Sequence, residues 1–279
     1  ETVMGVLSRP SAALSQDVVD YFRVLEVVET QAIASQRLAK EALLVALGID
    51  PELNLDRLAT SRRQFGQAMI GLRDGDAELG LPAAADEILE ELENALGLWG
   101  QMDEALRAGA ANGQMSADQI ALIAGVSDPL LDAVLAVSAH YRERAPGAEH
   151  FSMLVAAHNT CVQQRLLSQR MTKEYLLVAY GLDPQAHRQG LGQSTEEFNR
   201  ALDGLINGDL DMALLPAPTM QIKRKLLDIA EIWEGELRPL LAGAADGDRI
   251  SVDGVAEAAR INRLIMEEMS VAEALYEAL

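Results

Sequence analysis

The sequence has little cysteine, few aromatic residues and a shortage of positive charge. Its single cysteine, Cys161, excludes an internal disulfide, and a helical core in a chain of 279 residues needs no covalent support. Aromatic residues make up only 4% of the chain while hydrophobic residues make up 49%, which is typical of packed helices. Acidic residues outnumber lysine and arginine by 43 to 23, so we expect neither nucleic acid nor an anionic membrane surface as a partner.

Long apolar runs are also missing. No stretch of eighteen consecutive apolar residues occurs, so the sequence predicts no segment that crosses a bilayer. The chain begins at Glu1 without a methionine or a signal-type apolar segment, which is typical of a processed or trimmed product. Because the formal net charge is −20, any bound anion must meet a local, desolvated cation and not a general basic field.

The most informative feature that is present is an internal repeat. Residues 35–51 return as residues 168–184 at a constant offset of 133, with identical residues at 12 of 17 positions. Farther along, Trp99 matches Trp233 after one inserted residue. Such a duplication makes a pseudo-twofold axis the place to look for any feature that lies between the halves. The sequence therefore predicts two domains, residues 1–146 and 147–279, joined at residues 145–147.

Each repeat is expected to contain four helices. Apolar residues recur at helical spacing over residues 17–47, and Gly48 and Pro51 end this helix. Ser116 and Ser251 are good N-caps for the fourth helices. The remaining predicted helices are residues 150–180, 53–72 and 192–206, and third helices that follow Pro82 and Pro216 and contain Trp99 and Trp233. The predicted fold class is all-α, with two tandem four-helix bundles related by internal duplication.

One stripe of the second long helix carries the side chains best suited to binding. At 100° per residue, Arg165, Ser168 and Gln169 share a face, and the equivalent face of the first repeat has Ala32 opposite the arginine. A single desolvated guanidinium flanked by hydroxyl and amide groups suits a small planar oxyanion, because its fork supplies parallel charge-assisted hydrogen bonds. The predicted ligand-binding residues are Arg165, Ser168, Gln169, Ser35 and Gln36.

Simpler structural roles compete with this interpretation. Arg165 could instead form an ion pair with one of the 43 acidic residues. Arg37 and Arg170 each precede a glutamate by four positions, which favours surface or half-buried ion pairs, and the same structural interpretation applies to Lys40 and Lys173. Weaker candidates for ligand binding are His158, Gln164, Thr172, Arg37 and Arg170.

No catalytic or metal-binding motif is recognisable. The four histidines show no metal-ligand spacing with carboxylates or with Cys161, and this cysteine has no signature of a catalytic nucleophile. There is no glycine-rich phosphate loop, no nucleophile elbow and no Glu-x-x-His pair of the ferritin type. We therefore expect no enzyme, no catalytic residues, no metal and no cofactor.

The segment from Gln164 to Lys173 resembles the signature of PilJ-type sensor domains, the extracytoplasmic input modules of type IV pilus chemotaxis transducers. It is also similar to the ligand-binding box of nitrate-sensing input domains. The resemblance implies that the first arginine of the signature, here Arg165, grips nitrate or nitrite where two first helices meet. Two positions depart from the family pattern, since Gln163 replaces the usual glycine and Ala32 replaces the arginine of the first copy. A symmetric grip by two arginines therefore cannot form within one chain.

The resemblance implies a periplasmic or extracytoplasmic sensing module. In this hypothesis a small oxyanion, similar to nitrate or nitrite, binds between the two long first helices and shifts them, and a membrane receptor or a pilus or chemotaxis component reads the shift. The alternative is a helical protein-protein interaction module of a pilus or chemotaxis system with a degenerate ligand site. A homodimer that supplies a second Arg165 is a further alternative.

Overall fold

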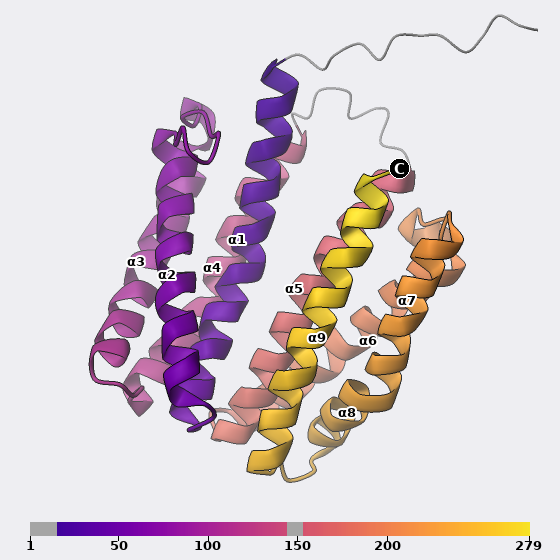
Figure 1. Ribbon diagram of the computed structural model, residues 1–279. Helices are drawn as coiled ribbons and strands as arrows, with labels where there is room; N and C mark the ends of the chain where they lie inside the picture. The colour runs from indigo at the N-terminus through magenta and orange to yellow at the C-terminus, as the bar shows by residue number, and fades with distance from the viewer. Residues whose placement is uncertain (1–15, 144–152) are drawn as a thin grey trace, which may run out of the picture.

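The computed structural model describes residues 16–143 and 153–279, and within them the regular structure is helical (Figure 1). The first bundle contains four long helices: α1 (Gln16–Ala46), α2 (Pro51–Asp74), α3 (Leu89–Ala111) and α4 (Ala117–Glu143). A short 3-10 turn, η1 (Asp86–Ile88), precedes α3. The predicted all-α fold is confirmed.

The second bundle repeats this order. It consists of α5 (Met153–Tyr180), α6 (Pro184–Asn207), the 3-10 turn η3 (Leu210–Met212), α7 (Met220–Ile232), the π-helical segment η4 (Trp233–Leu237), α8 (Arg238–Asp246) and α9 (Val252–Glu277). Because α7, η4 and α8 follow one another without a break, they form the third rod of a four-helix bundle. The predicted pair of duplicated bundles is confirmed, whereas the domain joint at 145–147 lies outside the described residues.

The two long first helices join the bundles. α1 packs against α2 and α4 of its own bundle and against α5, and α5 in turn packs against α6 and α9. In Figure 1, α1 begins and α9 ends at the same end of the molecule. Because α1 packs against α5, the predicted lengthwise contact of the two long first helices is present.

The link between the first and second helices is the same in both repeats. Gly48 and Gly181 adopt φ of 73° and 87°, and Asp50 and Asp183 are also left-handed at 40° and 34°. A proline then occupies the first turn of the next helix, where its missing N–H costs nothing. The repeated Gly-x-Asp-Pro sequence therefore produces the same tight reversal twice, as predicted.

The predicted start of α6 is wrong. The sequence suggested a helix from about Gly192, with Ser194 and Thr195 near its N-terminus, but the helix begins at Pro184. Ser194 is buried in mid-helix, and the Thr195 hydroxyl donates to the carbonyl of Leu191 at 2.7 Å, a bond within a continuous helix. The late start was predicted from the polar and acidic residues 194–197, which are typical of a helix N-terminus, but packing against α5 keeps the helix continuous through Gly190 and Gly192 despite their low helix propensity.

The third rod of the second bundle is also less regular than predicted. It changes to a π-helical turn at Trp233–Leu237, directly before Pro239. Proline cannot donate the usual backbone hydrogen bond of an α-helix, and π turns are a common way to absorb such a break. The first repeat has no proline at this place, and α3 is continuous.

Serine caps begin both fourth helices, as predicted. The Ser116 hydroxyl accepts from the Gln119 N–H at 3.2 Å, and the Gln119 side chain accepts from the Ser116 N–H at 2.8 Å, which is a capping box. The Ser251 hydroxyl accepts from the Gly254 N–H at 3.0 Å.

Replacing Ser251 by alanine is expected to lower the free energy of unfolding by about 1 kcal/mol, because one N–H of the first turn loses its acceptor. Urea denaturation followed by circular dichroism measures the change. Ser251→Asp serves as the control, since aspartate also caps. Equal losses in the alanine and aspartate variants would contradict the capping account.

One described helix, α4, is long and apolar enough to cross a membrane by length and composition alone. This helix was not predicted as a membrane span because its sequence contains no unbroken apolar run of eighteen residues. Leu130, Val134 and Val137 of α4 are buried, and the helix packs against α1 and α3. The role of a bundle core helix therefore accounts for its composition.

Candidate functional site

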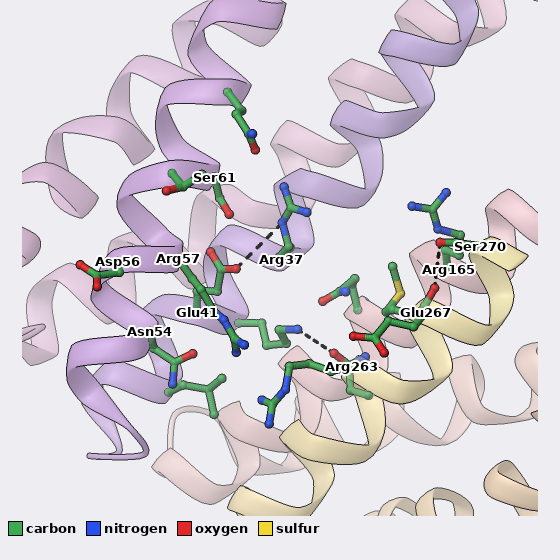
Figure 2. Close-up of a pocket in the computed structure, with 17 residues that line it drawn as sticks. Arg37, Glu41, Asn54, Asp56, Arg57, Ser61, Arg165, Arg263, Glu267 and Ser270 are labelled. Atoms are coloured by element: carbon green, nitrogen blue, oxygen red, sulfur yellow. Dashed lines mark hydrogen bonds and ion pairs between the residues drawn. The ribbon is translucent and has the colours of Figure 1, made fainter.

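A cavity of about 570 Å³ lies between the bundles, with walls from α1 and α2 on one side and α5 and α9 on the other (Figure 2). We call it the inter-bundle cavity. Its charged lining residues are unusual for a chain with a net charge of −20, because cations are in excess. The cations are Arg37, Lys40, Arg57, Arg165 and Arg263, and the acids are Glu41, Asp56 and Glu267.

Several polar atoms on its wall are buried without a hydrogen-bond partner among the described residues. They include the Gln169 Oε1, the Arg37 Nε and the Arg165 Nε, together with one oxygen each of Glu41 and Asn54. Gln169 and Asn54 are each only 2% exposed. Because unpaired buried polar atoms are costly, polar groups of a ligand or of solvent within the cavity would lower the free energy of the protein.

Lys40 is the most strongly perturbed of the cations. Its ammonium donates to the Asn262 Oδ1 at 2.6 Å, which is a contact from α1 to α9 across the two bundles. Burial lowers the pKa of Lys40 to about 7; Glu41 opposes the shift, and the positive charges of Arg37, Arg263 and Arg57 add to it. The lysine is thus held in a place that disfavours its charge.

Glu41 is the acid nearest to this lysine in sequence. Burial raises the pKa of Glu41, and Lys40 and Arg37 oppose the shift. The Arg37 Nε lies 4.0 Å from the Glu41 Oε1, so this pair is looser than a hydrogen-bonded salt bridge. Both side chains extend from α1 toward α2, as Figure 2 shows.

The equivalent lysine of the second repeat, Lys173, is in a different environment. Its ammonium contacts the Asp128 Oδ1 at 2.6 Å, the Glu174 Oε1 at 3.1 Å and the Ser127 Oγ at 3.3 Å. His187 also contacts Glu174, at 2.5 Å from its Nδ1 to the Oε2. The two lysines therefore reach across to the fourth helix of the opposite bundle in the same way, but only Lys173 meets a carboxylate there.

The structure separates the predicted ligand-binding residues into two groups. Arg165 and Gln169 line the inter-bundle cavity. Ser168 is fully buried and is not among the lining residues, and its hydroxyl accepts from the Asn262 Nδ2 at 2.8 Å. The Ser35 hydroxyl donates to the Ala32 carbonyl at 2.7 Å, and Gln36 donates to the Ser127 carbonyl of α4 at 3.0 Å. The two residues from the first repeat thus bond within the first bundle.

The weaker candidates are placed as follows. Arg37 lines the cavity, whereas Gln164 donates to the Phe198 carbonyl at 2.8 Å and Thr172 donates to the Ser168 carbonyl at 2.9 Å, both within the second bundle. Arg170 is partly exposed, with its Nε buried and unpartnered. His158 lies outside the inter-bundle cavity lining, near the end of α9.

Arg165 forms the structural ion pair that competed with the ligand hypothesis. Its Nη1 contacts the Glu273 Oε2 at 2.7 Å, and the arginine side chain is 24% exposed. It stands between the inter-bundle cavity and a second cavity of about 780 Å³ between α1 and the ends of α5 and α9. The predicted guanidinium is therefore at the seam, but it is already partly neutralised.

His158 has partners that the sequence did not reveal. Its Nε2 lies 3.1 Å from the Glu277 Oε1 and 3.6 Å from the Glu273 Oε1, and ligand atoms of all three residues fall within 4.8 Å of one another. The sequence showed no metal-ligand spacing for His158, and the structure brings it close to two carboxylates that lie more than 100 residues away along the chain. Glu273 also forms an ion pair with Arg165, so ion pairs with His158 and Arg165 account for the position of this carboxylate.

Cys161 is buried. Burial raises the pKa of the Cys161 thiol to about 12, with Glu273 adding to the shift and Arg165 opposing it. A thiol in this state is a poor nucleophile, which agrees with its predicted structural role.

The site residues that sequence reasoning missed are Arg57, Arg263, Asn262 and Lys40. A signal was available in the positions where the two repeats differ. Arg57 corresponds to Gly190, Arg263 to Asp128 and Arg165 to Ala32, so three differences add positive charge around the same cavity. Residues 35–51 and 168–184 contain what the two repeats share, whereas Arg57, Arg165 and Arg263 of the cavity lie at positions where the repeats differ.

Comparison with known proteins identifies a family for this chain. The family described as type IV pili methyl-accepting chemotaxis transducer N-term (PilJ) matches residues 30–123 and 159–258, one segment in each bundle. A search of curated proteins finds no matching relative. The two matched segments cover α1 from Thr30 onward and most of α5, and therefore include the helices that meet at the inter-bundle cavity.

Proposed function

Because the chain belongs to the family of type IV pili methyl-accepting chemotaxis transducer N-terminal domains, we propose that it is a ligand-sensing input module whose inter-bundle cavity binds a small anion. The observation that carries this proposal is the concentration of five cations and three acids around one cavity in a strongly acidic chain. Charge of this kind is costly to bury unless it meets an opposite charge. An anion in the cavity supplies that charge.

The location of the cavity fits a sensing role. Its walls come from both bundles, so a bound anion touches α1 and α2 on one side and α5 and α9 on the other. A ligand that prefers one spacing of the bundles shifts the population toward that spacing. Since α1 begins and α9 ends at the same end of the molecule (Figure 1), a shift between them is available to a partner there.

The family also suggests where and with what the module works. We place it outside the cytoplasm, with a membrane receptor or another chemotaxis or pilus component as the partner. The predicted nitrate and nitrite remain within the proposed class of ligands, with Arg165 and Gln169 as contacts. Ser168 supports them through Asn262.

Calorimetric titration of the whole chain with nitrate, nitrite, sulfate and short carboxylates tests the proposal. At least one anion is expected to bind, and Arg263→Ala and Arg165→Ala are each expected to weaken its binding about tenfold or more, because each removes a charge-assisted contact. The control is Arg62→Ala, since Arg62 pairs with Asp103 at 2.9 Å within the first bundle and should leave affinity unchanged. No heat from any anion, or equal affinities in all four proteins, would contradict the proposal.

The second candidate function is the interaction module. The observation that favours it is the Arg165–Glu273 ion pair, because the Glu273 carboxylate already binds the guanidinium that was predicted to bind the anion. α4 in addition exposes two separate apolar side chains, Leu122 and Leu135, to 42% and 40%, each of which is available for contact with a partner. Pull-down of a purified receptor or pilus component that depends on α4 substitutions, together with silence in the anion titrations, would support this alternative.

A further inference from the structure

The two repeats allow an internal comparison that points to a class of ligand. Lys40 and Lys173 are equivalent residues of the repeated segments 35–51 and 168–184. Each forms a hydrogen bond with the fourth helix of the other bundle, and the two partners, Asn262 for Lys40 and Ser127 for Lys173, are also equivalent residues. The surroundings of one lysine therefore show what the other one lacks.

At Lys173 the arrangement is complete. The lysine side chain is 1% exposed, and its ammonium has two carboxylate partners, Asp128 at 2.6 Å and Glu174 at 3.1 Å. Gly190, on α6, has no side chain to compete for this space, and a Cβ added there would lie 3.5 Å from the Glu174 Oε2. A buried charge that is paired and hydrogen-bonded in this way is tolerated.

At Lys40 the opposing carboxylate is missing. The residue equivalent to Asp128 is Arg263, and the residue equivalent to Gly190 is Arg57, so two cations stand where the other half has a carboxylate and a glycine. The described hydrogen bonds give the Lys40 ammonium one acceptor, the amide oxygen of Asn262. Figure 2 shows Arg57 and Arg263 extending toward the cavity from α2 and α9.

We propose that the inter-bundle cavity binds a small organic dicarboxylate, one carboxylate of which takes the place beside Lys40 that Asp128 takes beside Lys173. This rests on the proposed function and names the ligand class of the same site. With Arg165 neutralised by Glu273, the lining still has four cations, Arg37, Lys40, Arg57 and Arg263, against three acids, and a carboxylate ligand offsets this excess of positive charge. The side chain of Asp128 serves as a built-in analogue of the ligand in the other half.

The size and lining of the cavity favour an organic ligand. An ion of four atoms is small compared with a cavity of 570 Å³, so it would leave most of the space to water. Leu44 and Met266 provide apolar wall, and Ser61 and Ser270 provide hydroxyl groups. Cavities of this volume commonly hold organic ligands with a few polar contacts.

The test compares ligands and variants by calorimetry on the whole chain at pH 7. Dicarboxylates of four to six carbons, with succinate, malate and adipate as probes, are expected to bind at least tenfold more tightly than acetate, nitrate or sulfate. Arg263→Asp, which installs the carboxylate of the other half, is expected to weaken dicarboxylate binding about 100-fold, because it fills the place of the ligand and repels it. Arg57→Ala is expected to weaken it about tenfold without inserting a competing group.

Arg260→Asp is the matched control. It makes the same charge change on α9, but Arg260 is an exposed residue paired with Glu236 and Glu257 outside the cavity lining. Thermal unfolding verifies that Arg263→Asp is folded, and we expect its midpoint to rise because Lys40 gains a partner. If nitrate or sulfate binds in an Arg263-dependent way and no dicarboxylate binds more tightly, this inference fails while the proposed function stands. If no anion of any class binds, both fail.

Discussion

Replacing Lys40 by methionine is expected to stabilise the protein by about 2 kcal/mol at pH 6 in the absence of a ligand. The cause is the cost of burying this ammonium beside Arg37, Arg57 and Arg263. Lowering the pKa from 10.5 to about 7 corresponds to roughly 5 kcal/mol as an upper bound. Loss of the hydrogen bond to Asn262 and of the positive charge next to Glu41 reduces the net gain.

The gain should depend on pH in a defined direction. The pKa of Lys40 is lower in the folded state than in the unfolded state, so below about pH 7 both states hold the proton and the full cost is present. As the pH rises from 7 toward 10.5, the folded state loses its proton first, and the wild-type protein gains stability relative to the variant. The difference between the two proteins should therefore shrink between pH 7 and pH 10.

The matched variant is Lys173→Met, for which the opposite sign is expected. Removing this lysine leaves the buried Glu174 without its ammonium partner and releases Asp128, so we expect a loss of about 3 kcal/mol. Urea denaturation at pH 6, 8 and 9.5 measures both variants against the wild type. A shift of the same sign in both lysine variants would show that the two sites do not differ as the geometry indicates.

Replacing Trp233 by alanine is expected to lower the free energy of unfolding by about 4 kcal/mol, because it removes a fully buried indole from the core of the second bundle. The ring lies against Phe198 with centroids 4.4 Å apart, and its Nε1 donates to the Asn199 Oδ1 at 3.3 Å. In the first bundle Trp99 lies against Phe65 at 4.5 Å but is 7% exposed, so Trp99→Ala should cost less, about 3 kcal/mol.

Guanidinium denaturation followed by far-ultraviolet circular dichroism measures these losses without depending on tryptophan fluorescence. Trp233→Phe is the control, because it keeps an aromatic ring against Phe198 and should lose about half as much. If the phenylalanine variant is as unstable as the alanine variant, the contribution comes from the indole N–H and not from packing.

Much of the fold was predictable because it depends on local patterns. Helical spacing of apolar residues, the Gly-x-Asp-Pro links and the caps at Ser116 and Ser251 each act within a few residues, and the structure confirms them. The start of α6 and the π turn at Trp233 were missed because tertiary packing and Pro239 modify the helix in ways that periodicity does not show.

The candidate site was predictable only in part, for a related reason. Arg165 and Gln169 lie on a long helix whose lengthwise contact with its twin follows from the repeat, so their place at the seam could be predicted. Arg57 approaches Lys40 through the packing of α2 on α1 within the first bundle, whereas the approach of Arg263 on α9 depends on how one bundle rotates against the other. The helical periodicity of the sequence does not specify this rotation, so the cavity is visible only in the structure.

The duplication within one chain has a consequence for the shape of the response. A chain of two identical repeats would have two equal ligand-binding sites and could bind its ligand cooperatively. Here Asp128 already pairs with Lys173, whereas its equivalent near Lys40 is Arg263, which leaves Lys40 without that carboxylate partner. The proposed stoichiometry is therefore one ligand per chain. Occupancy should then follow a simple hyperbola with a Hill coefficient of about one, which makes the module suited to reporting gradual changes in concentration over a wide range.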